Sequence, residues 1–245
     1  CFLYPILDYL LKQKALNGEL SQGVRVLLLY PMNALANDQM KRLRSVLKDY
    51  KDITFGSYTG ETETTKKDAL DKYRSLNNSE PLQNEIISRE EMQLNPPHIF
   101  ITNYAMLEYL LIRPKDNVFF SGTTADKWKF IVLDEAHVYT GATGMEVSIL
   151  LRRLYHKLPN NDKIRFILTS ATLGDEKQND KICKFASSLC AETEFKPENI
   201  IRAQRREFQQ PNNCFTGTLE LYQKIAKILK ETTSEENISV SLALD

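Results

Sequence analysis

The chain has 245 residues, of which 42% are hydrophobic, and its 32 basic and 32 acidic side chains cancel. These values predict one large globular domain with insertions, and the zero net charge excludes a global field that attracts nucleic acid. No apolar run is long enough to span a membrane. Any nucleic-acid binding must therefore come from a local surface of a protein that we expect in the cytoplasm.

Cysteine usage points away from a metal or disulfide scaffold. The four cysteines, Cys1, Cys183, Cys190 and Cys214, show no C-x-x-C spacing, and the chain has only three histidines. A structural zinc site is disfavoured by this spacing. Free thiols in a reducing compartment are the expected state.

Strand and helix patterns alternate along the chain. Residues 1–14 show the apolar spacing of a helix, and residues 24–30 form an apolar run, stopped by Pro31, that is typical of a buried parallel strand. Ala36 begins an amphipathic helix. Further strands are predicted at residues 53–58, 99–102, 130–133 and 164–168, with helices after the second and third of these. This alternation predicts an α/β fold, a parallel doubly wound sheet with helices on both faces.

Two parts of the chain depart from this alternation. Residues 61–97 are polar and charged, which is typical of a functional insertion or a mobile loop. After residue 206 the pattern weakens, with a linker-like stretch at 209–213 and one more helix at 219–229. Ile200 and Ile201 are candidates for a last strand.

Two adjacent carboxylates, Asp134 and Glu135, close the apolar strand at 130–133. Open α/β sheets place their ligands at this end of the strands. One carboxylate can hold a hydrated Mg²⁺ while its neighbour orients a water for attack on a phosphate, as in a nucleotide-driven motor. The alternative is a surface Asp-Glu pair in a turn.

Polar residues also close the neighbouring strands. His137 can act as a metal ligand, a general base or a hydrogen-bond relay, and Ser170 and Thr172, two residues apart, are expected to point the same way. Short polar residues open helices or turns elsewhere, where free N–H groups can receive phosphate: Asn33, Thr59, Gly60, Thr102 and Asn103. Ordinary capping is the alternative for Asn and Thr at such positions.

Five ordered blocks carry a family resemblance: residues 30–39 (YPMNALANDQ), 58–62 (YTGET), 101–109 (ITNYAMLEY), 134–137 (DEAH) and 170–172 (SAT). Together they resemble the first RecA-like motor domain of superfamily 2 DEAD/DEAH-box helicases, over roughly residues 1 to 206. Their wording is most similar to bacterial DEAH helicases of the group with a C-terminal cysteine-cluster domain, which serve DNA repair and phage defence.

The resemblance implies ATP and Mg²⁺ as cofactors. It assigns Asp134 to the metal, through water, and Glu135 to the attacking water, while His137 couples this site to Ser170 and Thr172. The five helix-opening and turn residues would grip single-stranded nucleic acid without reading its sequence, with DNA favoured. Alternatives are an inactive binding module, or a duplex translocase within a restriction or defence complex.

Three departures from the family qualify this picture. No G-x-x-x-x-G-K-[S/T] loop occurs, so the chain lacks the family's phosphate cradle. The motifs of a second motor domain are absent too. Met32 and Asn33 stand where Thr and Arg are common, and Lys41, Arg42 and Arg44 are either compensation or, as we favour, a solvated helix face.

We therefore expect an internal piece of a longer helicase that starts just past its phosphate loop. Residues 1–206 form the ATP-binding domain, with 61–97 inserted, and 207–245 form a linker and helix toward a missing second motor domain. Little ATPase activity is expected of the chain alone.

Overall fold

The computed structural model describes residues 2–172, 176–190, 192–202 and 218–232. Contacts divide the chain into two units, Cys1–Ile200 and Ile201–Asp245. Predictions that concern Cys1, Cys214 and the linker-like residues 209–213 lie outside the described residues. Cys183 and Cys190 are free and buried, which confirms the predicted free thiols at these two positions.

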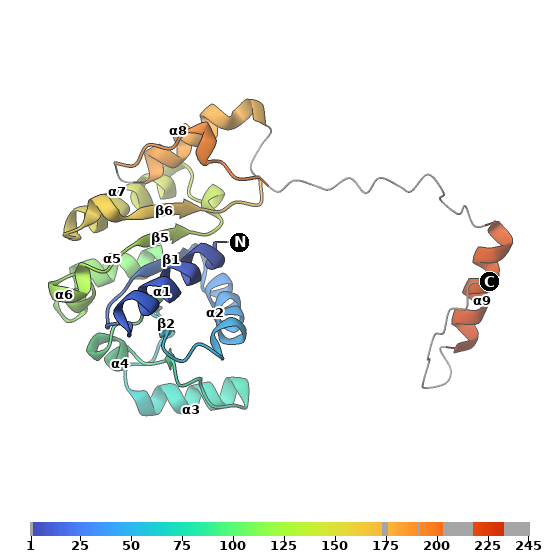
Figure 1. Cartoon of the computed structure of the whole chain (residues 1–245), viewed down its shortest axis with the longest axis horizontal. Helices are drawn as coiled ribbons and strands as arrows, with labels where there is room; N and C mark the ends of the chain where they lie inside the picture. Colours follow the sequence, from blue (N-terminus) through green and yellow to red (C-terminus); the bar gives the residue numbers. More distant parts are fainter. Residues whose placement is uncertain (1, 173–175, 191, 203–217, 233–245) are drawn as a thin grey trace. The chain divides into compact units, whose positions relative to one another are not determined.

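Six parallel strands form one sheet in the first unit (Figure 1), so the predicted fold class is confirmed. The strand order is β3-β2-β4-β1-β5-β6, so β1 lies between β4 and β5. The sheet consists of β1 (Val26–Tyr30), β2 (Phe55–Ser57), β3 (Glu85–Ile86), β4 (Ile99–Asn103), β5 (Phe130–Leu133) and β6 (Arg165–Leu168).

The helices follow the strands in the order expected of crossover connections. The α-helices are α1 (Leu3–Asn17), α2 (Asn33–Leu47), α3 (Lys66–Asn77), α4 (Arg89–Leu94), α5 (Tyr104–Ile112), α6 (Gly122–Ala125), α7 (Gly141–Lys157), α8 (Asn179–Leu189) and α9 (Leu219–Thr232). Short 3₁₀ turns are η1 (Pro114–Phe119), η2 (Ala136–Val138), η3 (Asn161–Lys163), η4 (Glu176–Gln178) and η5 (Pro197–Asn199). No helix in the part of the chain that the structure describes has the length and apolarity needed to cross a lipid bilayer.

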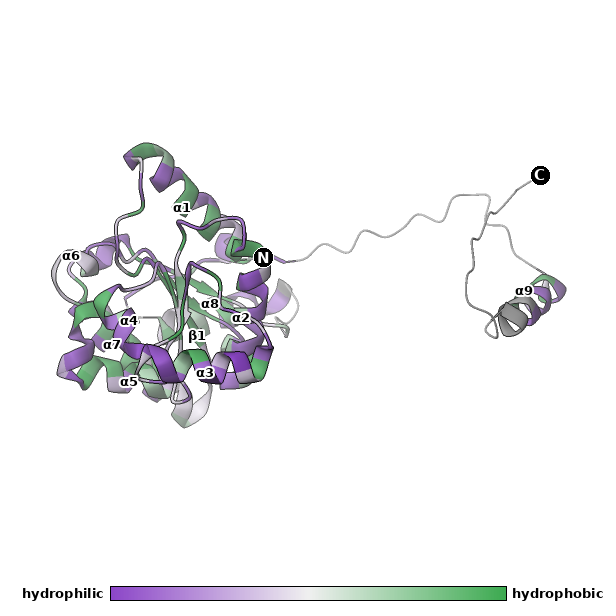
Figure 2. Cartoon of the chain, turned by 90° about the horizontal axis from the view of Figure 1, so that it is seen from below, coloured by the Kyte–Doolittle hydropathy of each residue, from purple (hydrophilic) through white to green (hydrophobic). Residues whose placement is uncertain are grey.

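Alternate residues of β1 serve two separate hydrophobic clusters, one on each face of the sheet. Val26 and Leu28 pack with buried residues of α1 and α2, whereas Leu27 and Leu29 pack with those of α5 and α7. All five β1 residues are buried, as in a strand covered on both faces. Figure 2 shows the hydrophobic strands enclosed by helices that carry hydrophilic residues.

Residues 61–97 fold into α3, β3 and α4, so of the two predicted alternatives, an insertion or a mobile loop, the structure matches the insertion. The sequence pattern missed these elements because polar side chains anchor them. Asn84 is 2% exposed and its amide nitrogen lies 3.0–3.1 Å from the carbonyl oxygens of Leu47, Tyr50 and Ile53. Polar anchors of this kind leave no apolar period to detect.

The candidate strand at Ile200 and Ile201 is wrong. The chain leaves η5 at Asn199, and Ile201 is 89% exposed with no strand pairing. In the second unit α9 matches the predicted helix, and its Leu219 and Tyr222 side chains are exposed.

Candidate functional site

The loops that follow β1, β2, β4, β5 and β6 all leave the C-terminal end of the parallel strands. They bring the predicted site residues into two groups. The carboxylate cluster comprises Asp134, Glu135, His137, Thr169, Ser170 and Thr172, from the loops after β5 and β6. The three-loop cluster comprises Asn33, Thr59, Gly60, Glu61, Thr102 and Asn103, from the ends of β1, β2 and β4.

Asp134 follows β5 directly and is half-buried. Its N–H donates to the Leu29 carbonyl oxygen at 3.1 Å, which continues the sheet pairing by one residue. The Thr169 hydroxyl donates to Asp134 Oδ1 and also accepts the Glu135 N–H at 3.3 Å. Thr169 therefore orients both predicted carboxylate residues, although sequence reasoning missed it. Its position one residue past the neighbouring strand is the signal that could have identified it.

Glu135 has a left-handed backbone, with φ of 51°. Residues other than glycine seldom adopt this region, and such residues gather at functional sites. The turn ends β5 and places Glu135 Oε2 3.3 Å from His137 Nδ1. The two carboxylates thus have different partners, since Asp134 bonds to Thr169 and Glu135 lies beside His137.

His137 Nδ1 lies between Glu135 Oε2 and Ser170 Oγ, at 3.3 and 3.2 Å. A single ring nitrogen either carries a proton to donate or a lone pair to accept. It can therefore accept from Ser170 or donate to Glu135, but not both at once. The atoms offer a two-state relay between the β5 and β6 loops.

Ser170 and Thr172 lie beyond the end of β6, so they do not point the same way from a strand as expected. Instead the Thr172 N–H donates to Ser170 Oγ at 3.2 Å, and the Thr172 residue is exposed. Ser170 is the one of the two whose side chain reaches His137 in the described contacts.

Two buried tyrosines lie near the Asp134 carboxylate. Burial, and then the charge of Asp134, raise the pKa of Tyr30 far above its ordinary value. The pKa of Tyr139 is raised by burial, by Tyr104 and by Asp134. Neither hydroxyl has a hydrogen-bond partner among the described residues, although both are buried. Two phenols that stay neutral therefore lie near the Asp134 carboxyl group.

The donor set fits a hydrated Mg²⁺ better than a metal held by protein alone. Within the described ranges, no group of three or more His, Cys, Asp or Glu side chains is arranged to hold a metal ion. Mg²⁺ keeps several water ligands and is held through one or two carboxylates together with substrate phosphates. Asp134 supplies one such carboxylate directly after β5.

Side-chain amides join the loops of the three-loop cluster. Asn103 Nδ2 donates to Asn33 Oδ1 at 2.7 Å, and Asn33 Nδ2 donates to Glu61 Oε1 at 2.9 Å. Asn103 Oδ1 accepts the Met106 N–H at 2.7 Å, which caps α5. One chain of hydrogen bonds thus crosses the ends of β4, β1 and β2.

The two threonines of this cluster face inward. Thr102 is fully buried and its hydroxyl donates to the Tyr58 carbonyl oxygen at 2.6 Å, which corrects the expectation that its side chain meets a ligand. Thr59 is 4% exposed and its Oγ1 accepts the Glu61 N–H at 3.2 Å. Both hydroxyls stabilise the loop instead, because its buried main-chain groups need partners.

Gly60 is exposed, and a Cβ added there meets no atom within 4 Å. Its φ lies outside the left-handed region. The fold therefore does not require glycine at this position. Any need for glycine must come from something that approaches the loop from outside.

The basic residues on α2 differ in their environments. Arg44 is paired with Glu85 at 2.8 Å, and the Glu85 side chain is 0% exposed, so Arg44 is not part of a solvated face. Lys41 and Arg42 are exposed, and Lys41 pairs with Asp38 at 3.1 Å. The charge of Arg42 lies near Tyr30, where it acts to lower the pKa of the phenol against the larger effects of burial and Asp134.

Comparison with known proteins finds several helicases. The DEAD/DEAH box helicase family matches residues 1–180. Druantia protein DruE of Escherichia coli is 29% identical over an alignment 273 residues long, which includes 77% of this chain and 15% of DruE. ATP-dependent helicase hrq1 of Schizosaccharomyces pombe is 32% identical over 164 residues, 62% of this chain and 12% of that protein.

A solved structure gives the same result in three dimensions. The crystal structure of DUF1998 helicase MrfA matches with a TM-score of 0.50 and 26% identity, over 74% of this chain and 23% of MrfA. MrfA bound to DNA matches with the same TM-score and identity. The chain thus spans less than a quarter of the length of each of these relatives.

Proposed function

The chain belongs to the DEAD/DEAH box helicase family, and we propose that it is the first RecA-like motor domain of an ATP-dependent helicase or translocase. The observation that carries this proposal is that the carboxylate cluster and the three-loop cluster both lie at the C-terminal end of the parallel strands. A helicase motor needs its nucleotide-hydrolysis site and its nucleic-acid-binding site close to each other. The name of hrq1, an ATP-dependent helicase, and the DNA-bound structure of MrfA support both parts.

At the carboxylate cluster, Asp134 would hold Mg²⁺ through water, and Thr169 keeps the carboxylate in place. ATP with its metal, when bound, supplies the phosphoryl group and a charge that offsets the phosphates. Glu135 orients the attacking water and receives its proton. Phosphoryl transfer depends mainly on positioning and charge stabilisation, which this arrangement provides.

His137 and Ser170 would report the nucleotide state from one loop to the next. The choice of His137 Nδ1 between Glu135 and Ser170 depends on what lies at Glu135. Thr172 would follow, because its main-chain N–H is bonded to Ser170 Oγ.

The three-loop cluster would hold a single strand, with DNA favoured, through its phosphates. Asn33, Asn103 and the exposed Gly60 offer amide groups and an open main chain, while Thr59 and Thr102 support them from within. Contacts of this kind position a strand without reading its bases.

The domain organisation of the whole protein is part of the proposal. Residues 1–206 would be the ATP-binding domain, and 207–245 would lead toward a second motor domain. The sequence contains no G-x-x-x-x-G-K-[S/T] loop, and the chain spans 15% of DruE. We propose that residues outside this sequence supply the phosphate loop and the second domain, so this chain alone should hydrolyse little ATP.

The test is ATP hydrolysis by the complete gene product, with and without single-stranded DNA. Glu135→Gln should abolish the DNA-stimulated rate while oligonucleotide binding persists. Glu19→Gln is the matched control, since this exposed residue lies between α1 and β1, at the N-terminal end of the parallel strands and away from the site.

A second candidate is an inactive RecA-like module that only binds nucleic acid or protein. Absence of hydrolysis in the unaltered gene product, with oligonucleotide still bound, would establish that alternative. Hydrolysis that drives displacement of a third strand from a triplex, without unwinding, would instead identify a duplex translocase.

A further inference from the structure

We propose that the α3–β3–α4 segment is a built-in support for the Thr59–Glu61 loop, with Arg89 and Lys72 as positioning residues for nucleic-acid binding. This inference rests on the proposed function of the three-loop cluster. It assigns a role to residues 61–97, whose polar sequence indicates only an insertion or a loop.

Arg89, the first residue of α4, binds the loop from within. Its Nη2 donates to the carbonyl oxygens of Thr59 and Gly60 at 3.0 and 3.2 Å. The guanidinium lies over the Tyr58 ring, 5.4 Å from its centroid. The Arg89 N–H donates to the Glu63 carbonyl oxygen at 3.0 Å. The side chain is therefore held by the residues on both sides of the turn.

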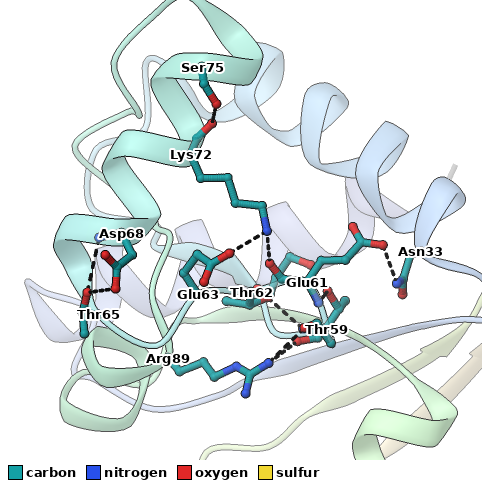
Figure 3. A network of polar contacts seen from close by, with 12 residues as sticks. Asn33, Thr59, Glu61, Thr62, Glu63, Thr65, Asp68, Lys72, Ser75 and Arg89 are labelled. Atoms are coloured by element: carbon teal, nitrogen blue, oxygen red, sulfur yellow. Dashed lines mark hydrogen bonds and ion pairs between the residues drawn. The ribbon is translucent and has the colours of Figure 1, made fainter.

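Lys72 of α3 binds the next carbonyl along the loop. Its ammonium group donates to the Glu61 carbonyl oxygen at 2.6 Å and to Glu63 Oε1 at 2.8 Å. Figure 3 shows Arg89 and Lys72 reaching the loop from two sides. Three consecutive carbonyl oxygens, those of Thr59, Gly60 and Glu61, thus accept from cationic side chains of one segment.

These bonds keep three carbonyl oxygens of the loop turned toward cationic side chains, while the Thr59 and Glu61 N–H groups are bonded within the loop. Carbonyl oxygens repel phosphate, whereas N–H groups and positive charge attract it. Cations that bind three successive carbonyls hold the peptide planes in one orientation and neutralise their negative ends. Ordering a free backbone costs about 1–2 kcal/mol per residue, and a loop already held does not incur that cost on binding.

The support extends to the other two loops through Glu61. Its main-chain carbonyl is bound by Lys72, and its carboxylate accepts the Asn33 amide, which in turn accepts from Asn103. Movement of the Thr59–Glu61 loop would therefore release Asn33 as well. Arg89 and Lys72 thus act on the whole three-loop cluster through the loop carbonyl groups that they bind.

The segment is itself anchored firmly enough to serve as a support. Thr65 caps α3 through the Asp68 N–H at 3.2 Å, and Ser88 caps α4 through the Glu91 N–H at 3.3 Å. Met92 of α4 is fully buried. These anchors fix the two helices from which the cationic side chains extend.

The experiment measures the affinity of this chain for a fluorescein-labelled oligothymidylate by fluorescence anisotropy over a range of salt concentrations. Arg89→Met and Lys72→Met should each weaken binding by about tenfold, the equivalent of ordering one residue. Arg89→Lys should restore part of the loss. Arg74→Met is the matched control, because Arg74 lies exposed on α3 and pairs with Glu80 away from the loop.

The salt dependence separates a positioning role from direct contact. A side chain that binds phosphate contributes about one unit to the slope of log affinity against log salt, and its loss lowers that slope. Arg89→Met should leave the slope unchanged. Thermal unfolding of each variant identifies any that does not fold, in which case Lys72→Met decides the question.

Two results would overturn the inference alone: Arg89→Met and Lys72→Met binding as well as Arg74→Met, or a slope lowered by one charge in either variant. Failure of the unaltered chain to bind the oligonucleotide at any salt concentration would instead reject the proposed nucleic-acid grip, and the support role with it.

Discussion

Thr169 is the side chain that holds the Asp134 carboxylate in the described contacts, and it also accepts the Glu135 N–H. One hydroxyl thus orients the proposed metal-linked carboxylate and the turn that carries the proposed water-orienting one. Partners of this type commonly matter nearly as much as the ligands they orient.

Thr169→Val in the complete gene product should lower DNA-stimulated ATP hydrolysis by about 10- to 100-fold and raise the Mg²⁺ concentration needed for half-maximal rate. The valine keeps the shape of threonine and removes its hydrogen bonds. Thr123→Val, an exposed threonine on α6 before β5, is the control. An unchanged Mg²⁺ dependence would remove Thr169 from the site.

Gly60 offers a second test at the residue scale. Since a Cβ there meets no atom within 4 Å, Gly60→Ala should change the free energy of unfolding by no more than about 0.5 kcal/mol. The added methyl group lies on the outer surface of the loop, so oligonucleotide affinity should fall. Urea unfolding and anisotropy measure the two effects. Equal affinity would mean that the strand does not pass over Gly60.

At the scale of elements, β3 is a two-residue edge strand that pairs with β2 and is tied to α2 and α3 by polar contacts of Glu85. The Glu85 side chain is fully buried and accepts from Arg44 of α2 at 2.9 and 3.1 Å and from the Tyr73 hydroxyl at 3.3 Å. Arg44 also lies over the Tyr73 ring, 5.0 Å from its centroid. Burial lowers the pKa of Arg44, but bonding to Glu85 outweighs this and leaves the pKa raised.

Arg44→Met should destabilise the chain by about 3 kcal/mol, because it leaves a buried carboxylate without its cation. Glu85→Gln combined with Arg44→Met should recover part of that loss, since no charge then remains buried. Urea unfolding measures both, with Arg74→Met, which breaks an exposed pair with Glu80, as the reference. If Arg44→Met alone is no less stable than Arg74→Met, the prediction is wrong.

For the whole molecule, a buried histidine lies at the N-terminal end of the parallel strands, opposite the candidate site. His98 is 3% exposed and its Nδ1 accepts the Thr54 N–H at 3.0 Å. Burial, with Arg25 and Lys127 nearby, lowers the pKa of His98 from 6.5 to about 4. The folded protein therefore resists a proton that the unfolded chain accepts.

This pKa shift makes stability depend on pH. Because the folded pKa is the lower one, the contribution is complete above pH 6.5 and is lost as the pH falls from 6.5 toward 4. Between pH 7 and pH 5 the loss from His98 is about 2 kcal/mol. His98→Asn, which keeps an acceptor for Thr54, should reduce the pH dependence of urea unfolding, whereas exposed His156→Gln should not. If the free energy of unfolding of His98→Asn depends on pH as steeply as that of the unaltered chain, His98 is not the cause of the pH dependence.

The sequence by itself determined the alternation of strands and helices, the parallel sheet and the positions of Asp134, Glu135 and the helix starts at Asn33 and Tyr104. These depend on local periods and on apolar runs, because burial of one face repeats every two or 3.6 residues. A motif at the end of such a run is placed at the sheet edge by the topology alone.

Only the tertiary structure decided how the loops are held. The bonds from Thr169 to Asp134, from Arg89 to the Thr59–Gly60 turn and from Arg44 to Glu85 join residues that lie about thirty to forty positions apart. Polar contacts at such separations have no period in the sequence, and each needs a backbone already folded to bring its atoms together. The same reason explains why Thr102 faces inward and why residues 61–97 form ordered structure.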